Sequence, residues 1–203
     1  MKEKTVKIEV SNLTYDSSNV EIIGRNQDYS LTMYADKDID PKTFSQFIRK
    51  VERLVRGSSE YKEYIRFLRE EEGLDYCVYL KNINVTNAEI QLHHVITNLY
   101  MICSTVFSKL ISEGKKVSTF ILADEVLKLH LDNKVALVPL SVTMHELAHS
   151  VDLKIPSSVI YGDYMSYYEM YNPFMEKYER QCFEEIFQLK CLTKENVVKV
   201  SYE

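Results

Sequence analysis

Residues 135–149 read Val-Ala-Leu-Val-Pro-Leu-Ser-Val-Thr-Met-His-Glu-Leu-Ala-His, and this stretch decides the expected fold. Its first six residues have an extended, apolar character, but Pro139 forbids a place in the centre of a sheet because proline cannot donate to the ladder. Ser141 is a good N-cap residue, which predicts a helix that carries His145 and His149. Residues four apart share one face of a helix, so these two imidazoles can bind one ion.

A second histidine pair, His93-His94, ends a strand that we predict over residues 88–92. The chain has five histidines, and four of them fall in these two clusters. Neutral imidazole is the commonest protein ligand for transition metals and the usual general base near neutral pH. Chemistry at a metal is therefore the first hypothesis. The fifth histidine, His130, is interpreted as an ordinary core or surface residue.

Composition predicts a globular protein with one compact domain or two small ones. Hydrophobic residues make up 45% of the 203 residues and charged residues 27%, which is ordinary for a soluble protein. Apolar runs are too short for a membrane span, and the charged start Met1-Lys2-Glu3-Lys4-Thr5 does not begin a signal peptide. We therefore expect a cytoplasmic protein with no membrane partner. The scattered cysteines are expected to be reduced and buried rather than paired: Cys77, Cys103, Cys182 and Cys191.

The net charge of −5 limits any nucleic-acid hypothesis, because proteins that bind nucleic acid usually present a basic surface. Positive charge must then be found locally, for example among the basic residues of 49–56 or 109–116. The simplest interpretation of both groups is a solvated helix face. Tyrosine is abundant, and seven of the 15 tyrosines fall between Tyr161 and Tyr202, which predicts a tyrosine-rich core helix.

The fold class predicted from periodicity is α+β. Alternating residues predict a strand-rich N-terminal portion with strands over 4–10, 20–23 and 29–35. Residues 75–80 and 88–92 are predicted to pair as a hairpin through residues 82–87. Helices are predicted from caps and apolar spacing: from Asp40-Pro41 to Gly57, from Ser58 or Ser59 to Gly73, from about Asn98 to Ser112, from about Phe120 to Leu131, and from about Asp163 to Leu192 with a break at Pro173.

The clearest boundary between two regions of the chain lies near residues 73–88. We predict an accessory α+β region of unknown role over residues 1–75. Residues 76–203 then form a metal-binding region with a C-terminal tyrosine-rich helix.

The motifs of this second region resemble the HNH endonuclease superfamily. The stretch Glu89-Ile90-Gln91-Leu92-His93-His94 is followed by Leu137-Val138-Pro139-Leu140 and then by His145 and His149. The family pattern has a D/H-H pair, an Asn that opens an N-L-V-x-L-type segment, and a helix with H-x-x-x-H. The stretch from His94 to Ile102 is similar to the T-L-Y-type helix start of HNH-like proteins from tailed bacteriophages. The resemblance covers residues 89–150 and does not cover the first 75.

This resemblance implies a ββα-metal core wrapped by helices and a metal-dependent endonuclease that hydrolyses nucleic-acid phosphodiesters, with DNA as the expected partner. It makes His93, His145 and His149 the ligands of one divalent ion (Zn, Ni, Mn or Mg), as in the three-histidine shell of colicin-type DNases, and His94 the general base. The family Asn that orients the base falls at Ala136, so Asn133 is the nearby substitute. A phage origin would place the protein in the host-cell cytoplasm, and a homodimer is one possible assembly.

Two other functions stay open for the same residues. His145-Glu146-Leu147-Ala148-His149 satisfies the H-E-x-x-H pattern of zinc metallopeptidases, with Glu146 as the base and Glu169 or Glu176 as a third ligand. That function leaves His93-His94 without a role. Alternatively, a structural metal site could stabilise a non-catalytic phage protein that binds a host factor, a hypothesis that suits the acidic net charge.

Overall fold

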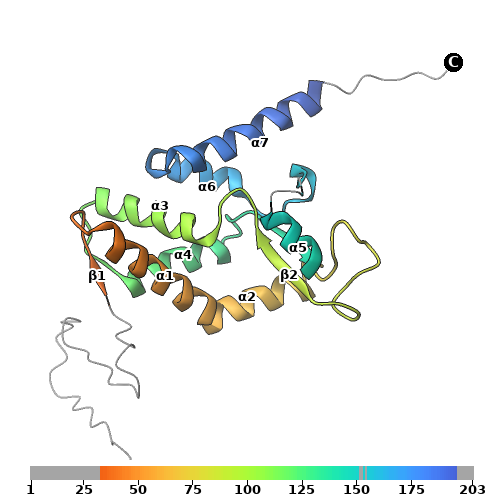
Figure 1. Ribbon diagram of the computed structural model, residues 1–203, viewed down its shortest axis with the longest axis horizontal. Coiled ribbons are helices and arrows are strands. Elements are labelled where there is room, and N and C mark those ends of the chain that lie inside the picture. The colour runs from red at the N-terminus through yellow and green to blue at the C-terminus, as the bar shows by residue number, and fades with distance from the viewer. Residues whose placement is uncertain (1–32, 151–152, 154, 196–203) are drawn as a thin grey trace, which may run out of the picture. The chain divides into compact units, whose positions relative to one another are not determined.

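The computed structural model describes residues 33–150, 153 and 155–195, with side chains as far as Phe187. They belong to one compact unit of the chain, residues 32–203. Helices dominate this unit, and two short antiparallel sheets join segments that are distant in the sequence (Figure 1). The fold class is thus α+β, as predicted. The strands predicted over 4–10 and 20–23, and most of the one over 29–35, lie outside the described residues.

The elements follow one another in this order: β1 (Tyr34–Ala35), α1 (Pro41–Gly57), α2 (Ser59–Glu70), β2 (Ile90–His94), α3 (Leu99–Ser112), β3 (Val117–Ser118), α4 (Thr119–Leu131), β4 (Leu137–Ser141), α5 (Val142–His149), the 3-10 turn η2 (Ser157–Val159), α6 (Tyr164–Tyr171), the 3-10 turn η3 (Asn172–Phe174) and α7 (Lys177–Glu195). β1 pairs with β3, and β2 pairs with β4.

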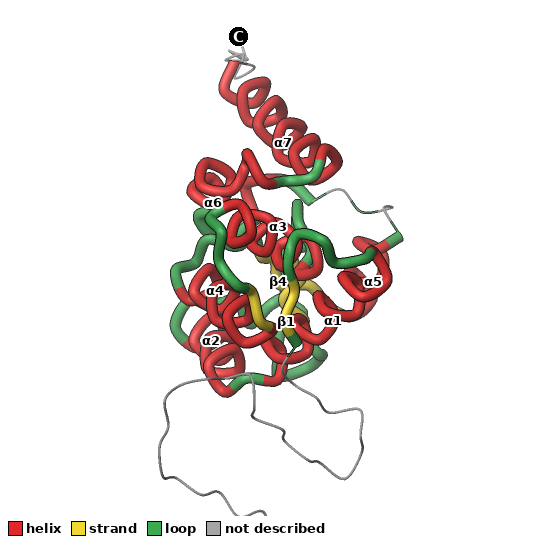
Figure 2. The backbone as a smooth tube through the Cα atoms, turned by 90° about the vertical axis from the view of Figure 1, so that its left-hand side faces the viewer, coloured by secondary structure: helices red, strands yellow, loops and turns green. Residues whose placement is uncertain are grey.

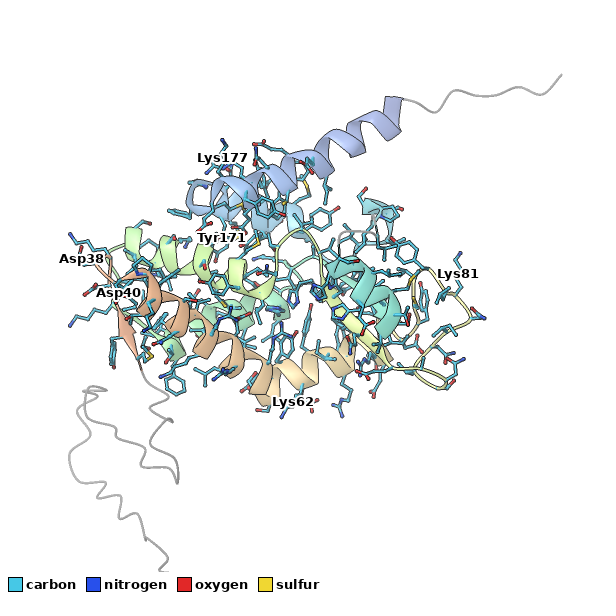
Figure 3. The ribbon with its side chains drawn as sticks, in the orientation of Figure 1. Asp38, Asp40, Lys62, Lys81, Tyr171 and Lys177 are labelled. Carbon is cyan, nitrogen blue, oxygen red and sulfur yellow. The ribbon has the colours of Figure 1, made fainter. Side chains whose placement is uncertain are left out.

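Local capping chemistry explains the bounds of the first two helices. The Asp40 carboxylate accepts hydrogen bonds from the backbone N–H groups of Lys42 and Thr43, both at 3.1 Å, and Pro41 occupies the first helical position. α1 ends at Gly57 as predicted, and the Ser58 hydroxyl accepts from the Tyr61 N–H at 3.1 Å to start α2. Figure 3 shows Asp40 at the start of α1.

The core lies where α1, α3 and α4 meet. α1 contacts both of the other helices, and α3 and α4 contact each other (Figures 1 and 2). All three helices contribute fully buried side chains, and each large apolar side chain that is buried stabilises the fold by about 1.5–3 kcal/mol. The largest of these are Phe47 and Ile48 of α1, Leu99 and Ile102 of α3, and Leu122 of α4.

β2 and β4 form a two-stranded antiparallel sheet in which Leu92 lies opposite Pro139. The Pro139 carbonyl accepts a hydrogen bond from the Val78 N–H at 3.1 Å, on the side away from β2. Backbone N–H and C=O of one residue point to the same side of an antiparallel strand, so the missing proline N–H interrupts no bond to β2. This position agrees with the prediction that Pro139 cannot lie in a central strand, because on its other side β4 pairs with no strand of the described residues, and its only bridge there is the isolated one between Leu137 and Tyr161.

The predicted hairpin between residues 75–80 and 88–92 is wrong. Residues 75–87 form a compact loop held by an isolated bridge between Tyr76 and Asn84, and β2 pairs instead with β4. The alternation of apolar residues specifies which face of a strand is buried, but it does not specify the partner strand. The partner of β2 is β4, a strand whose residues are all buried in the core.

The C-terminal helical pattern breaks at Pro173 as predicted, because α6 ends at Tyr171 and α7 begins at Lys177 after the turn η3. Tyr164, Tyr167 and Tyr171 of α6 are buried, which confirms a tyrosine-rich core element. Cys77, Cys103 and Cys182 are free thiols. Among the described helices, we find none with the length and apolar character that a membrane crossing requires.

Candidate metal centre

The histidines are brought together by the order of three elements. β2 ends in His93-His94 and lies antiparallel to β4, and β4 passes directly into α5 at Ser141. α5 contacts both strands and lies beside β2 in Figure 1. The helix start at Ser141 is confirmed, although the Ser141 side chain makes no capping hydrogen bond. The paired strands and the helix that follows β4 therefore hold His93 against His145 and His149.

His93, His145 and His149 form a compact cluster. Each offers one ring nitrogen, and the three nitrogen atoms all lie within 4.8 Å of one another. The His93 ring centroid lies 4.7 Å from that of His145 and 4.8 Å from that of His149, and the His145 and His149 centroids are 4.6 Å apart. Since the spacing suits three donors around one small cation, these three residues could hold a metal ion.

The surroundings keep the imidazoles of His93 and His145 in the form that binds a metal. Burial, followed by the neighbouring rings of His145 and His149, lowers the pKa of His93 to about 4. Burial and the His149 ring also lower the pKa of His145. Both rings are therefore neutral near pH 7, with a lone pair free for coordination. The donor set fits a borderline ion such as zinc or nickel better than magnesium, which prefers oxygen ligands.

His94 lies on the other face of β2, because successive side chains of a strand alternate. Its Nε2 atom lies 3.0 Å from Nε2 of His130, a residue of α4. His94 is half-buried, whereas His130 is fully buried. Burial, followed by the nearby His130, holds the pKa of His94 well below its usual value.

A cavity of about 900 Å³ joins the two faces at the end of β2. His93, His94, His145 and His149 all line it. Its walls come from α1, α2, β2, α3, α5 and α7.

Three side chains with a fixed charge line this cavity: Arg56, Arg69 and Glu185. One Arg69 Nη donates to the Ile90 carbonyl at 2.7 Å, which ties this cation to the strand that carries the histidine pair. The Arg69 Nε is buried with no hydrogen-bond partner among the described residues. The cavity thus combines imidazoles with two guanidinium groups, a combination that suits an anionic ligand.

Asn133 and Ala136 lie outside the residues that line the cavity. Asn133 directly follows the C-cap of α4 with a positive φ of 54°, and its backbone N–H donates to the His130 carbonyl at 2.8 Å. Ala136 is buried, and its carbonyl accepts from the Val95 N–H at 3.0 Å, so it lies across from the residue after His94. The side chain that contacts His94 is instead that of His130.

The carboxylates of the peptidase hypothesis are not gathered at the histidines. Glu146, Glu169 and Glu176 are exposed, and none of them is among the residues that line the cavity. Glu185, on α7, does line it together with His145 and His149. Glu185 is not part of the three-histidine cluster, so its place in the cavity wall does not make it a fourth ligand.

Reasoning from the sequence missed the places of His130, Arg69 and Glu185, whereas Arg56 is one of the basic residues of 49–56 that it offered as local positive charge. His130 had one usable signal, namely that it is one of only five histidines. Arg69 and Glu185 had none, since charged residues on a helix are most simply solvated. Their roles depend on how α1, α2 and α7 pack around β2.

The described residues thus define a mixed α+β protein with a histidine cluster that can hold a metal ion, set in a partly cationic cavity. Residues 1–202 match the family model of the bacteriophage G278-like virion protein. The chain belongs to this family of virion proteins, which confirms the expected phage origin. No curated protein and no solved structure matches the chain.

Proposed function

We propose that this virion protein is a metal-dependent endonuclease of the HNH type that hydrolyses phosphodiester bonds in nucleic acid, with DNA as the substrate. One observation carries the proposal: the nitrogen atoms of His93, His145 and His149 converge within 4.8 Å, while a fourth histidine and two arginines line the same cavity. A nuclease uses all of these groups. β2, β4 and α5 also resemble in space the two antiparallel strands and helix of a ββα-metal core, although α3, β3 and α4 separate β2 from β4 in the sequence.

In the proposed reaction, His94 accepts a proton from the attacking water. The water oxygen then forms a bond to phosphorus as the bond from phosphorus to the 3′ oxygen breaks. The departing oxygen takes a proton from solvent, so the products carry a 5′-phosphate and a 3′-hydroxyl. A divalent ion held by the three histidines would neutralise the phosphate and stabilise the departing oxygen. Arg56 and Arg69 attract and orient the phosphate through charge-assisted hydrogen bonds.

The cavity favours this function over a peptidase. A zinc peptidase needs Glu146 at the metal, but Glu146 is exposed and lies outside the cavity lining. Two guanidinium groups beside the histidines suit a phosphodiester better than a neutral peptide bond.

A second candidate function is structural, and the family match favours it. In a non-catalytic virion protein, the same three histidines would bind a metal that holds α5 against β2. The surface of the protein would then bind another phage protein or a host factor. This function also explains the absence of any fully buried residue in α5, because the metal would add to the contacts that the half-buried Met144 and Ala148 make with the core.

Cleavage of supercoiled plasmid tests the proposal. Wild-type protein, His94→Ala and Glu146→Gln are each incubated with manganese, magnesium, nickel or zinc, and with a chelator. We expect metal-dependent nicking by the wild type and by Glu146→Gln, and a loss of about 100-fold or more in His94→Ala, the range ascribed to a general base. Metal binding by His94→Ala, measured by calorimetry, should match the wild type.

A negative result in the nicking assay distinguishes between the structural function and the peptidase. If no metal supports nicking, the nuclease proposal is wrong, and thermal stabilisation by zinc alone supports the structural function. Loss of activity in Glu146→Gln but not in His94→Ala, with casein as substrate, would establish the peptidase. Product ends with a 3′-phosphate would contradict the proposed bond cleavage.

A further inference from the structure

His130 is a fully buried histidine whose two ring nitrogens both have partners. Its Nδ1 lies 2.8 Å from the Val126 carbonyl oxygen, and its Nε2 lies 3.0 Å from Nε2 of His94. A carbonyl oxygen only accepts hydrogen bonds, so the proton on Nδ1 of His130 is the donor in the first contact. The polarity of the second contact then depends on the charge of His130.

The surroundings of His130 favour the neutral ring. Tyr61 and Tyr64 of α2 present their rings edge-on to it, with centroids 5.3 and 6.0 Å away, and Arg56 is the nearby cation. Burial lowers the pKa of His130 to about 4. A neutral imidazole with its proton on Nδ1 has a lone pair on Nε2, so His130 accepts a hydrogen bond from Nε2–H of His94.

We infer that His130 is the positioning residue for His94: it holds the His94 proton on Nε2 and so leaves Nδ1 of His94 as the basic nitrogen. The inference rests on the proposed function only in one part, namely that Nδ1 of His94 accepts the proton of the attacking water. A general base needs one defined tautomer, and the partner of the other nitrogen selects it. In the family pattern, the Asn that orients the base histidine falls at the position of Ala136. His130 therefore takes over that orienting role for His94.

The hydrogen-bond polarity can be measured directly, without activity. Long-range proton–nitrogen correlation spectra of the full chain, labelled with ¹⁵N-histidine, report which nitrogen of each ring carries the proton. The His94 signals are assigned by their loss in His94→Ala. We expect His94 to occupy a single tautomer with the proton on Nε2, both in metal-free protein and with zinc alone. A proton on Nδ1 of His94 would overturn the inference whatever the nuclease assay shows.

Two matched variants test whether His130 sets this tautomer. His130→Leu fills a similar volume but cannot accept, so His94 should distribute between both tautomers. His130→Gln can place its amide oxygen near the position of Nε2, and it should restore the single tautomer. If His94 keeps one tautomer in a folded His130→Leu, His130 does not position it. The wild-type spectrum decides the polarity even if His130→Leu fails to fold.

Nuclease assays of the same variants separate this inference from the proposed function. We expect nicking by His130→Leu to fall about 10–100-fold, the usual effect of losing a partner that orients a metal-site residue. Bound zinc should be unchanged, and His130→Gln should recover most of the activity. If the predicted tautomer is present but the wild type does not nick DNA, the positioning role stands and the proposed nuclease fails.

Discussion

His93 and His94 are adjacent in the sequence, yet they meet different partners because a strand turns successive side chains to opposite faces. His93 contacts the histidines of α5, whereas His94 contacts His130 of α4. After His94 the chain makes a tight turn in which Thr97 N–H donates to the Val95 carbonyl at 2.8 Å and Ile96 has a φ of 71°. A β-branched residue in this region costs about 1–3 kcal/mol, and such strain is concentrated at functional sites.

Removing one imidazole should abolish tight metal binding. In His145→Ala, we expect zinc affinity to fall by more than about 100-fold, beyond the effect of losing an orienting partner alone. Isothermal titration of metal-free protein measures it. Glu146→Ala is the matched control, because Glu146 is the next residue of α5 and is exposed. Equal zinc affinity in His145→Ala and wild type would show that the three histidines do not share one ion.

Acid should destabilise the metal-free protein through its neutral histidines. The pKa of His130 is about 4 in the folded protein against 6.5 for an unperturbed histidine, so below pH 6.5 the unfolded chain binds more protons. The stabilisation is complete above pH 6.5 and is lost as the pH falls toward about 4, at about 1.4 kcal/mol per pH unit for each such histidine.

Urea unfolding in the presence of a chelator, from neutral pH to about pH 4, measures this loss. His130→Gln is the control, since it removes one titrating group and should reduce the pH dependence over the same window. Identical pH dependence in the two proteins would contradict a neutral, buried His130.

Helix starts follow local chemistry closely. α1, α3 and α4 begin at N-cap side chains that accept backbone hydrogen bonds, namely Asp40, Asn98 and Ser118. Because a cap acts within three residues, the sequence is enough to locate it. Strand pairing acts over much longer separations, and the wrong hairpin at residues 75–92 shows the consequence.

The bridge between β4 and the loop after η2 depends on Gly162. Leu137 exchanges two backbone hydrogen bonds with Tyr161, at 2.9 and 2.8 Å. Gly162 has a φ of 105°, and an added Cβ would meet the Val135 carbonyl oxygen at 2.0 Å. We therefore expect Gly162→Ala to lower the free energy of unfolding by clearly more than 1 kcal/mol, which chemical denaturation can measure.

Gly73→Ala provides the matched comparison. Gly73 also has a positive φ, of 69°, but an added Cβ would meet no atom within 4 Å. Its substitution should cost only the backbone strain, about 1–2 kcal/mol. A smaller loss in Gly162→Ala than in Gly73→Ala would mean that the close approach to Val135 is not maintained in solution.

For the molecule as a whole, α5 carries two of the three clustered histidines although none of its residues is fully buried. α5 has no buried residue, in contrast to α1, α3 and α4, whose apolar faces form the core. Its position relative to β2 therefore rests on the half-buried Met144 and Ala148, on backbone continuity with β4 and on the histidine cluster. Lys62 on α2 and Lys81 on the loop before β2 are exposed, and Figure 3 shows both on the outside of the molecule.

Zinc should accordingly stabilise α5 more than the rest of the fold. A ligand that binds only the folded state at 100 times its Kd stabilises it by about 2.7 kcal/mol. We expect the melting temperature to rise with zinc and to fall back with a chelator. Hydrogen exchange should slow most in residues 142–149. Uniform protection across α1, α3 and α5 would contradict a site that fastens this one helix.

The sequence by itself determined the local features: the helix starts and stops, the break at Pro173, the edge character of Pro139 and the two histidine pairs. These depend on propensity, capping and spacing, which act within a few residues. Only the tertiary structure decided that β2 pairs with β4, that His93 turns toward α5 and His94 toward His130, and that Arg56, Arg69 and Glu185 line one cavity. Those contacts join segments tens of residues apart, and the burial of the shared core selects among the many pairings that the local pattern allows.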